Sequence, residues 1–124
     1  MHFTQREQAA LREVGLSDDN IEDASDLVVA ATQEAADDLL DFFDGEVTMY
    51  SDMDVAHSAS DVQEHAVDYL DLYTHADDIR GYLRFKSWGV PVAGGRVLSA
   101  DVVELTLGPT VDGRVRFSTD REAI

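Results

Sequence analysis

The stretch RGYLRFKSWGVPVAGGRVLSADVVELTLGPTVDGRVRF, residues 80–117, decides the fold class of this 124-residue chain. Short runs rich in Val, Leu, Phe and Tyr alternate there with glycine and proline turns, which is typical of β-strands joined by tight connections. The runs predict strands over residues 81–85, 96–98, 102–107 and 114–117. Because a single turn separates the last two, we expect them to form a hairpin.

The N-terminal part of the chain has helical spacing instead. Thr4 and Glu7 form a capping-box pattern, and Gly15 is expected to end the helix that follows. A second helical piece begins at Ser17, and longer helices are predicted over residues 25–43 and 60–73, with a strand over residues 47–53 between them. In the second long helix the inward side chains would be Val62, Ala66, Tyr69, Leu70 and Tyr73.

Helices followed by a β meander predict a single α+β domain over residues 1–124. We expect its N-terminal helices to pack on a C-terminal, mostly antiparallel sheet. The apolar content of 44% is high enough for an ordinary hydrophobic core.

Acidic residues dominate the composition. The chain carries 26 Asp and Glu against nine Lys and Arg, a formal net charge of −17, and Lys86 is its single lysine. Such like charge opposes a compact state in dilute buffer, whereas at 1 M salt a Debye length of about 3 Å removes most of the repulsion. The acidic, lysine-poor, cysteine-free profile resembles that of cytosolic haloarchaeal proteins. We expect weak association of K⁺ or Na⁺ with surface carboxylates, and we predict no other cofactor.

The charges are unevenly distributed along the chain. From Glu13 to Ile79 there are 20 acidic residues and no lysine or arginine, whereas residues 80–124 contain seven bases and five acids. The last third is therefore locally basic, with a charge of +2, and it is where we expect function.

Composition excludes several classes of protein. The absence of cysteine excludes disulfides, thiolate metal sites and cysteine nucleophiles. No apolar run approaches the roughly 18 residues of a membrane-spanning helix. The N-terminal MHFTQREQ has no signal-peptide core. We therefore expect a cytoplasmic protein with no membrane partner.

Residues 9–24, AALREVGLSDDNIEDA, resemble a helix-turn-helix. A second helix that reads DNA has to neutralise phosphates with arginine or lysine. Here that helix carries only carboxylates, namely Asp18, Asp19, Glu22, Asp23 and Asp26. We therefore do not expect the N-terminal helices to read DNA.

Histidines and aspartates form another candidate site. His57, His65 and His75 lie within nineteen residues, and His65 and Asp68 would share one face of the predicted helix. Imidazole and carboxylate are ligands of zinc or iron, so a small metal-dependent enzyme would use Asp54, His57, His65 and Asp68. The spacing matches no metal motif, and a buried or capped structural histidine is the simpler interpretation.

A basic β face is the candidate that we favour. Alternation places Arg80, Tyr82, Arg84 and Lys86 on one side of a strand, and Arg114 and Arg116 alternate in the same way. If the two strands are neighbours, their cations share a surface suited to phosphate, single-stranded nucleic acid or an acidic partner. Alternatively, the arginines pair with carboxylates of the same chain or of a symmetric copy.

Trp88 is the only tryptophan, and it lies in a loop predicted over residues 87–95. It is expected either to anchor an interface or to cap the core. No phosphate-loop motif and no serine-nucleophile motif occurs in the chain.

Residues 49–89, MYSDMDVAHSASDVQEHAVDYLDLYTHADDIRGYLRFKSWG, are similar to short conserved haloarchaeal proteins of unassigned function. This resemblance implies habitat and size, and it transfers no catalytic residue. The sequence thus predicts a non-enzymatic binding or regulatory module that acts through the basic β face and the Trp88 loop, as a homodimer or with a protein partner. A small metal-dependent enzyme and a nucleic-acid-binding protein using the same face are the alternatives.

Overall fold

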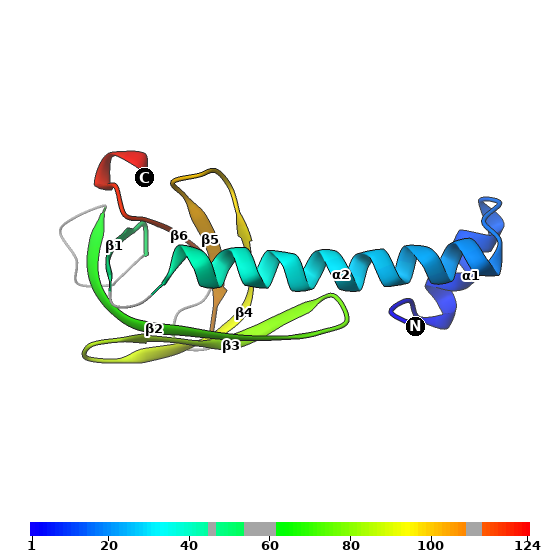
Figure 1. The fold of residues 1–124 in the computed structure, drawn as a ribbon, viewed down its shortest axis with the longest axis horizontal. Helices are drawn as coiled ribbons and strands as arrows, with labels where there is room; N and C mark the ends of the chain where they lie inside the picture. Colours follow the sequence, from blue (N-terminus) through cyan, green and yellow to red (C-terminus); the bar gives the residue numbers. More distant parts are fainter. Residues whose placement is uncertain (45–46, 54–61, 109–112) are drawn as a thin grey trace.

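A computed structural model describes residues 1–44, 47–53, 62–108 and 113–124. Two α-helices come first and are followed by six strands and a short 3-10 helix (Figure 1). The helices are α1 (Gln5–Glu13) and α2 (Asp18–Phe42), and the 3-10 helix is η1 (Arg121–Ala123). The strands are β1 (Val47–Ser51), β2 (Gln63–His75), β3 (Asp78–Phe85), β4 (Gly89–Val97), β5 (Val103–Leu107) and β6 (Gly113–Ser118).

The six strands form a closed barrel. Each strand pairs antiparallel with the next one along the chain, and β1 also pairs with β6 through Tyr50 opposite Ser118 and Ser51 opposite Phe117. The expectation of helices packed on an open α+β sheet is therefore wrong, although the helices do precede the strands. Closure joins the first strand to the last, and such a long-range pairing leaves no local pattern in the sequence.

The segment predicted as a helix over residues 60–73 is strand β2 from residue 63 onwards. A β-bulge between Val67 and Tyr69 inserts one extra residue, so the inward side chains Val67 and Leu70 are three residues apart. A spacing of three residues is typical of a helix, and the helix predicted from it placed Tyr69 and Tyr73 on its inward side. Both tyrosines are exposed instead.

Most of strand β4 was also missed, because its glycines and Pro91 are typical of a loop, and the strand predicted over residues 96–98 covers only its last two residues. Val90 and Val92 are buried in the barrel, and Pro91 between them is exposed. The predicted strands before and after β4 correspond to β3, β5 and β6, and the predicted hairpin of β5 with β6 is confirmed by their pairing. Its turn, residues 109–112, lies outside the described residues.

The helix ends follow the sequence closely. Thr4 and Glu7 make both hydrogen bonds of a capping box. Gly15 has a φ of 100° and ends α1, with hydrogen bonds from its N–H to Arg12 O and from Leu16 N–H to Leu11 O. Helix α2 then runs unbroken from its Ser17 cap, which joins two pieces that were predicted separately.

The end of α2 contributes to the core of the barrel. Ala36, Leu39 and Phe43 pack among the inward side chains of the strands, and the Phe43 ring lies edge-on to Phe117. The first half of α2 extends beyond the barrel, with α1 beside its start (Figure 1). Leu27 in that half is 71% exposed.

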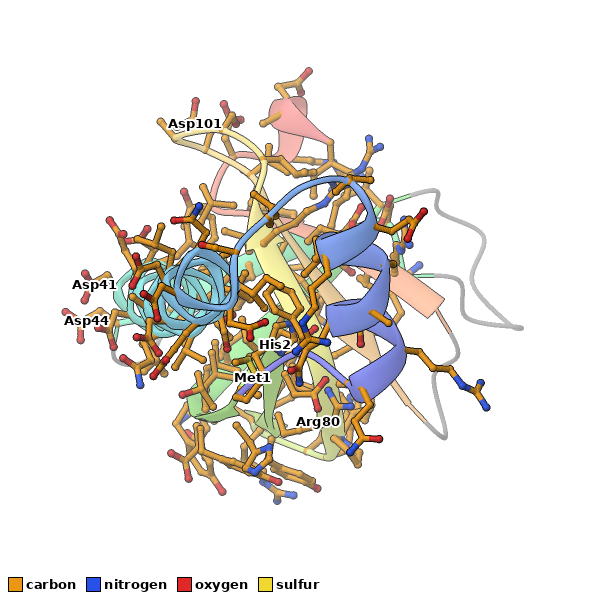
Figure 2. The ribbon with its side chains drawn as sticks, turned by 90° about the vertical axis from the view of Figure 1, so that its right-hand side faces the viewer. Met1, His2, Asp41, Asp44, Arg80 and Asp101 are labelled. Atoms are coloured by element: carbon orange, nitrogen blue, oxygen red, sulfur yellow. The ribbon has the colours of Figure 1, made fainter. Side chains whose placement is uncertain are left out.

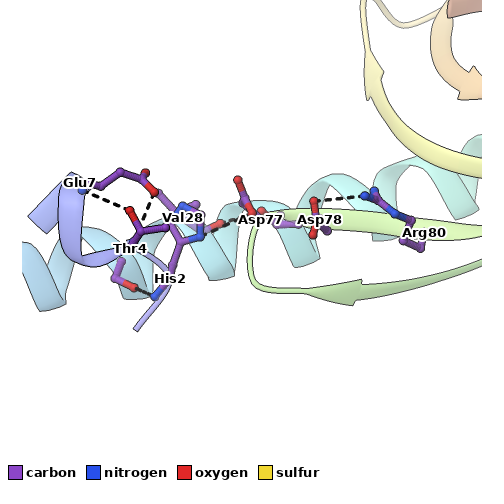
Figure 3. A network of polar contacts seen from close by, with 9 residues as sticks. His2, Thr4, Glu7, Val28, Asp77, Asp78 and Arg80 are labelled. Atoms are coloured by element: carbon purple, nitrogen blue, oxygen red, sulfur yellow. Dashed lines mark hydrogen bonds and ion pairs between the residues drawn. The ribbon is translucent and has the colours of Figure 1, made fainter. Parts of the chain in front are cut away.

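A polar cluster fixes the N-terminal segment to α2 and to the tip of the β2–β3 hairpin (Figure 3). The His2 backbone N–H donates to the hydroxyl of Ser25, which is buried, at 2.6 Å. His2 Nδ1 lies 3.5 Å from a carboxylate oxygen of Asp77 in the hairpin turn. Ala76, also in that turn, has a φ of 55°.

Candidate functional site

The closed barrel separates the two halves of the predicted basic face. Strand β3 has β2 and β4 as neighbours, whereas β6 has β5 and β1. The two arginine-bearing strands are therefore as far apart as a six-stranded barrel allows. Arg80, Tyr82, Arg84 and Lys86 lie on one outer surface, and Arg114 and Arg116 lie on another.

The second of these surfaces is a cleft across β4, β5 and β6. Glu104 on β5 lies opposite Arg96 on β4 and opposite Arg116 on β6. Two residues further along β5, Thr106 lies opposite Arg114 on β6. A cavity of about 240 Å³ opens here, and we call it the arginine cleft; it is lined by Gly95, Arg96, Glu104, Thr106 and Arg114.

The charges of the arginine cleft are only partly compensated. Glu104 is 9% exposed and its Oε1 lies 3.1 Å from Arg96 Nε. The side chains of Arg114 and Arg116 make no hydrogen bond or ion pair with any residue that the structure describes. The lining of the cleft carries two guanidinium groups and one carboxylate, a local charge of +1, in a chain with a net charge of −17.

The first surface has a different character. On β2 the outward side chains Tyr69, Asp71 and Tyr73 lie opposite Arg84, Tyr82 and Arg80 on β3. We call these six residues the tyrosine face. Its three rings are 50%, 65% and 38% exposed for Tyr69, Tyr73 and Tyr82. A Cβ atom at Gly89 would overlap the ring of Tyr82, so this ring lies directly against the backbone of β4.

Sequence reasoning found only half of the tyrosine face. Tyr82 and the two arginines follow from the alternation of β3, but Tyr69 and Tyr73 were assigned to the inward side of a helix. The alternation of Tyr69, Asp71 and Tyr73 with apolar residues was the signal that could have placed them on a strand. Arg96 was missed for another reason: it begins the short strand predicted over residues 96–98, and no local pattern connected that strand with the other arginines.

The other residues of the predicted basic face are already engaged. Arg80 donates to the Ala93 carbonyl at 2.8 Å and lies 3.5 Å from Asp78, and Lys86 Nζ lies 2.7 Å from Asp68 Oδ1. Trp88 is partly buried on the core, with its ring centroid 4.6 Å from that of Phe85. Its position is that of a core cap, one of the two roles that we expected.

His65 lies inside the barrel, paired with a serine. Its Nε2 is 2.7 Å from the hydroxyl of Ser51, which is fully buried and accepts a hydrogen bond from Met53 N–H. The imidazole ring also contacts Phe85 and Phe117. Burial lowers the pKa of His65 below its usual 6.5 and so favours the neutral ring, whose tautomer sets which of the two groups donates in the hydrogen bond with Ser51.

Of the predicted metal ligands the structure describes His65 and Asp68, and it does not bring these two together. His65 points into the barrel, whereas Asp68 binds Lys86 on the outside, since β2 is a strand and the two residues share no helical face. Asp54 and His57 lie outside the described residues, and the metal-dependent enzyme stays a prediction. Within residues 1–44, 47–53, 62–108 and 113–124, no group of three His, Asp or Glu side chains is arranged to hold a metal ion.

The acidic side chains of α2 do not pair with the arginines of the barrel surface in the described structure. Asp41 and Asp44 point away from the strands on one side of the molecule, and Arg80 lies on another (Figure 2). The predicted pairing of arginine with carboxylate occurs within the strands at Arg96 and Arg80, and at Arg12 with Asp18 near the start of α2. It leaves Arg84, Arg114 and Arg116 without such a partner among the described residues.

Within the described part of the chain, neither α-helix has the length and apolar character needed to cross a bilayer. No curated protein and no solved structure matches the chain. A model of a family of unknown function, DUF7532, matches residues 1–122. The chain therefore belongs to the DUF7532 family.

Proposed function

We propose that this protein is a non-enzymatic binding module that holds an oxyanion, a carboxylate or phosphate group of its ligand, in the arginine cleft. One observation carries the proposal. Arg114 presents a guanidinium group without a partner among the described residues, in a concave site that also contains Arg96.

The residues around Arg114 suit this role. A guanidinium group offers several N–H donors in a planar fork that matches the two oxygens of a carboxylate or phosphate. Thr106, opposite Arg114, adds a hydroxyl donor. Glu104 holds Arg96 by its Nε atom, which restrains the second guanidinium group and leaves its remaining donors for a ligand.

The charge of the rest of the molecule shapes which ligands fit. A chain of net charge −17 repels polyanions at low salt, and the cleft is a local exception to this repulsion. We therefore favour a compact oxyanion or a single acidic side chain of a protein partner over a long nucleic acid.

Composition alone supports the setting that we propose for this module. The acidic, lysine-poor sequence favours a cytoplasm of high salt, as in haloarchaea, with K⁺ or Na⁺ weakly associated with exposed carboxylates. Measuring the free energy of unfolding against KCl concentration tests this. Stability that rises steeply towards molar KCl supports the setting, and stability independent of salt contradicts it.

Isothermal titration calorimetry with two probes, sodium pyrophosphate and sodium citrate, tests the proposed function. Arg114→Gln keeps much of the side-chain volume but removes the charge, and we expect it to weaken binding at least about tenfold, as for a lost charge-assisted hydrogen bond. The matched control is Arg84→Gln on the tyrosine face, which should bind as the unaltered protein does.

The two probes separate the possible ligands. Binding of pyrophosphate alone indicates a phosphate ligand, and binding of citrate alone indicates a carboxylate. Failure of the unaltered protein to bind either probe, or equal loss in the Arg114 and Arg84 variants, overturns the proposal.

A further inference from the structure

The tyrosine face combines large exposed rings with charges that lack partners. Tyrosine and arginine are the residues most enriched at the centres of protein interfaces. A tyrosine side chain presents roughly 150–250 Å². With the exposures of Tyr69, Tyr73 and Tyr82, the three rings offer roughly 300 Å² of the about 800 Å² that each partner buries in a stable complex.

Two residues of opposite charge on this face have no partner among the described residues. The side chains of Asp71 and Arg84 make no hydrogen bond or ion pair with the described residues. Asp71 lies opposite Tyr82 and Arg84 lies opposite Tyr69, so the two charged residues are diagonal neighbours on adjacent strands. The backbone positions of such neighbours are about 7–8 Å apart. Arg80 and Lys86, by contrast, are satisfied by Asp78 and Asp68.

The balance of charge indicates what kind of partner fits. Together with the residues that border it, the face carries three cations and three carboxylates, the latter being Asp68, Asp71 and Asp78. Single-stranded nucleic acid requires a surplus of cations along its backbone, and no surplus exists here. A surface with equal numbers of opposite charges is instead complementary to its own copy.

We propose that the tyrosine face is the contact surface of a symmetric homodimer, in which Asp71 of each copy pairs with Arg84 of the other. In a two-fold arrangement the same patch is used on both subunits. A two-fold axis that lies in the plane of the interface and passes between Asp71 and Arg84 brings Asp71 of each copy next to Arg84 of the other copy. Each of these charges is then paired once, which gives two ion pairs per dimer, and the tyrosine rings are buried around them.

This surface shares no residue with the arginine cleft, so the dimer and the proposed oxyanion site stand or fall separately. Sedimentation equilibrium at protein concentrations up to about 100 µM, where dimers of micromolar affinity are populated, measures the association. It is run in about 0.15 M and about 2 M KCl, because the higher salt screens charge pairs but not the burial of rings.

Single charge reversals, and then their mixture, provide the decisive comparison. Arg84→Asp and Asp71→Arg each place like charges against each other in a homodimer, and we expect each to raise the dimer Kd at least about tenfold in the lower salt. When the two variants are mixed in equal amounts, every like-charge contact becomes an attractive pair. The mixture should therefore form heterodimers with an affinity within about threefold of the unaltered protein.

Two further variants separate this face from the rest of the surface. Tyr73→Ser removes an exposed ring and should weaken the dimer about tenfold in both salts. Arg114→Asp in the arginine cleft is the matched control and should leave the dimer unchanged. Thermal melting by circular dichroism checks that each variant is folded.

The proposal is overturned by an unaltered protein that remains monomeric, or by a dimer whose Kd is insensitive to the changes at positions 71, 73 and 84. Failure of the mixture to recover affinity overturns the Asp71–Arg84 pairing. A monomer that binds a labelled oligothymidylate, and loses this binding with Tyr73→Ser, assigns the face to single-stranded nucleic acid instead.

Discussion

The tyrosine face and the arginine cleft are built from the same local pattern, yet they differ in charge and shape. Both contain a strand with two arginines on its outward side, Arg80 and Arg84 on β3 and Arg114 and Arg116 on β6. Strand β2 places rings and a carboxylate beside the first pair, and β4 and β5 place Arg96 and Glu104 beside the second. The neighbouring strand therefore decides what an arginine-bearing strand can bind.

The difference has a physical consequence for each surface. Charges are equal in number on and around the tyrosine face, where exposed rings provide area for an interface. In the arginine cleft the charge is +1 and the surface is concave, which favours a small anion. Four experiments can break or sharpen this distinction, beginning with the largest effect.

Adding a methyl group to a backbone glycine should destabilise the protein much more under the tyrosine face than beside the arginine cleft. A Cβ atom at Gly81, under the tyrosine face, would overlap the carbonyl oxygen of Asp71, whereas at Gly94, beside the cleft, it would lie 3.5 Å from Thr106 Oγ1. We expect Gly81→Ala to lower the free energy of unfolding by about 3 kcal/mol, because backbone atoms of β2 or β3 have to move. Gly94→Ala, the control, should change it by less than about 0.5 kcal/mol. Urea denaturation measures both, and equal effects would contradict the contrast.

The protonation of His65 should make the stability of the barrel depend on pH. Its ring contacts Phe85 on β3 and Phe117 on β6, so it packs against both sides of the barrel. Burial lowers the pKa of His65 in the folded state, whereas the unfolded chain takes up the proton near pH 6.5. Its contribution to stability is therefore complete above pH 6.5 and is lost as the pH falls from there towards the lower folded-state pKa.

His65→Phe keeps a ring but should remove this pH-dependent component. It also removes the histidine that is hydrogen-bonded to the Ser51 hydroxyl, which costs about 1–3 kcal/mol at neutral pH. Urea denaturation at several pH values compares the variant with the unaltered protein and with His75→Gln, at the exposed end of β2. A pH dependence that is unchanged in His65→Phe would show that this histidine is not responsible.

Removing the carboxylate of the cleft should sharpen its difference from the tyrosine face. Glu104→Gln raises the charge of the cleft lining from +1 to +2 and releases Arg96, so we expect pyrophosphate affinity to rise at least about threefold. Stability should fall by less than about 1 kcal/mol, because the Arg96 side chain is 62% exposed and its ion pair is screened by water. Calorimetry with Asp71→Asn as control checks the result, and a similar gain in that control would argue against a local effect.

The smallest expected effect concerns the hairpin tip at the end of the tyrosine face. Ala76 has a φ of 55°, a conformation that glycine adopts more readily than alanine. Ala76→Gly should raise the free energy of unfolding by about 0.5 kcal/mol. Ala100→Gly, in the β4–β5 turn where no positive φ occurs, should lower it slightly. Thermal melting of both variants tests the difference, and destabilisation by Ala76→Gly would show that the turn is not strained.

Local chemistry was sufficient for several parts of this protein. The capping box at Thr4, the glycine end of α1 at Gly15, the strands β1, β3, β5 and β6, and the β5–β6 hairpin all follow from short patterns. Each depends on residues that are close in sequence, so the pattern and its cause lie together. The arginines of both surfaces were recognised for the same reason, apart from Arg96.

Errors arose where a local irregularity disguised a strand. The bulge between Val67 and Tyr69 changed the spacing of inward residues in β2 from two to three, and Pro91 with two glycines hid β4. In both places the hydrogen bonds to neighbouring strands stabilise an extended backbone that the local sequence does not require.

The sequence by itself determined the acidity of the chain, the identity of its basic residues and the alternation that turns them outward, because these depend on composition and on single strands. Only the tertiary structure decided that β1 pairs with β6. That closure sets β3 and β6 on opposite sides, so one predicted basic face became the tyrosine face and the arginine cleft. The physical reason is that strand order is determined by the joint packing of all six strands around one core, and no single segment contains that information.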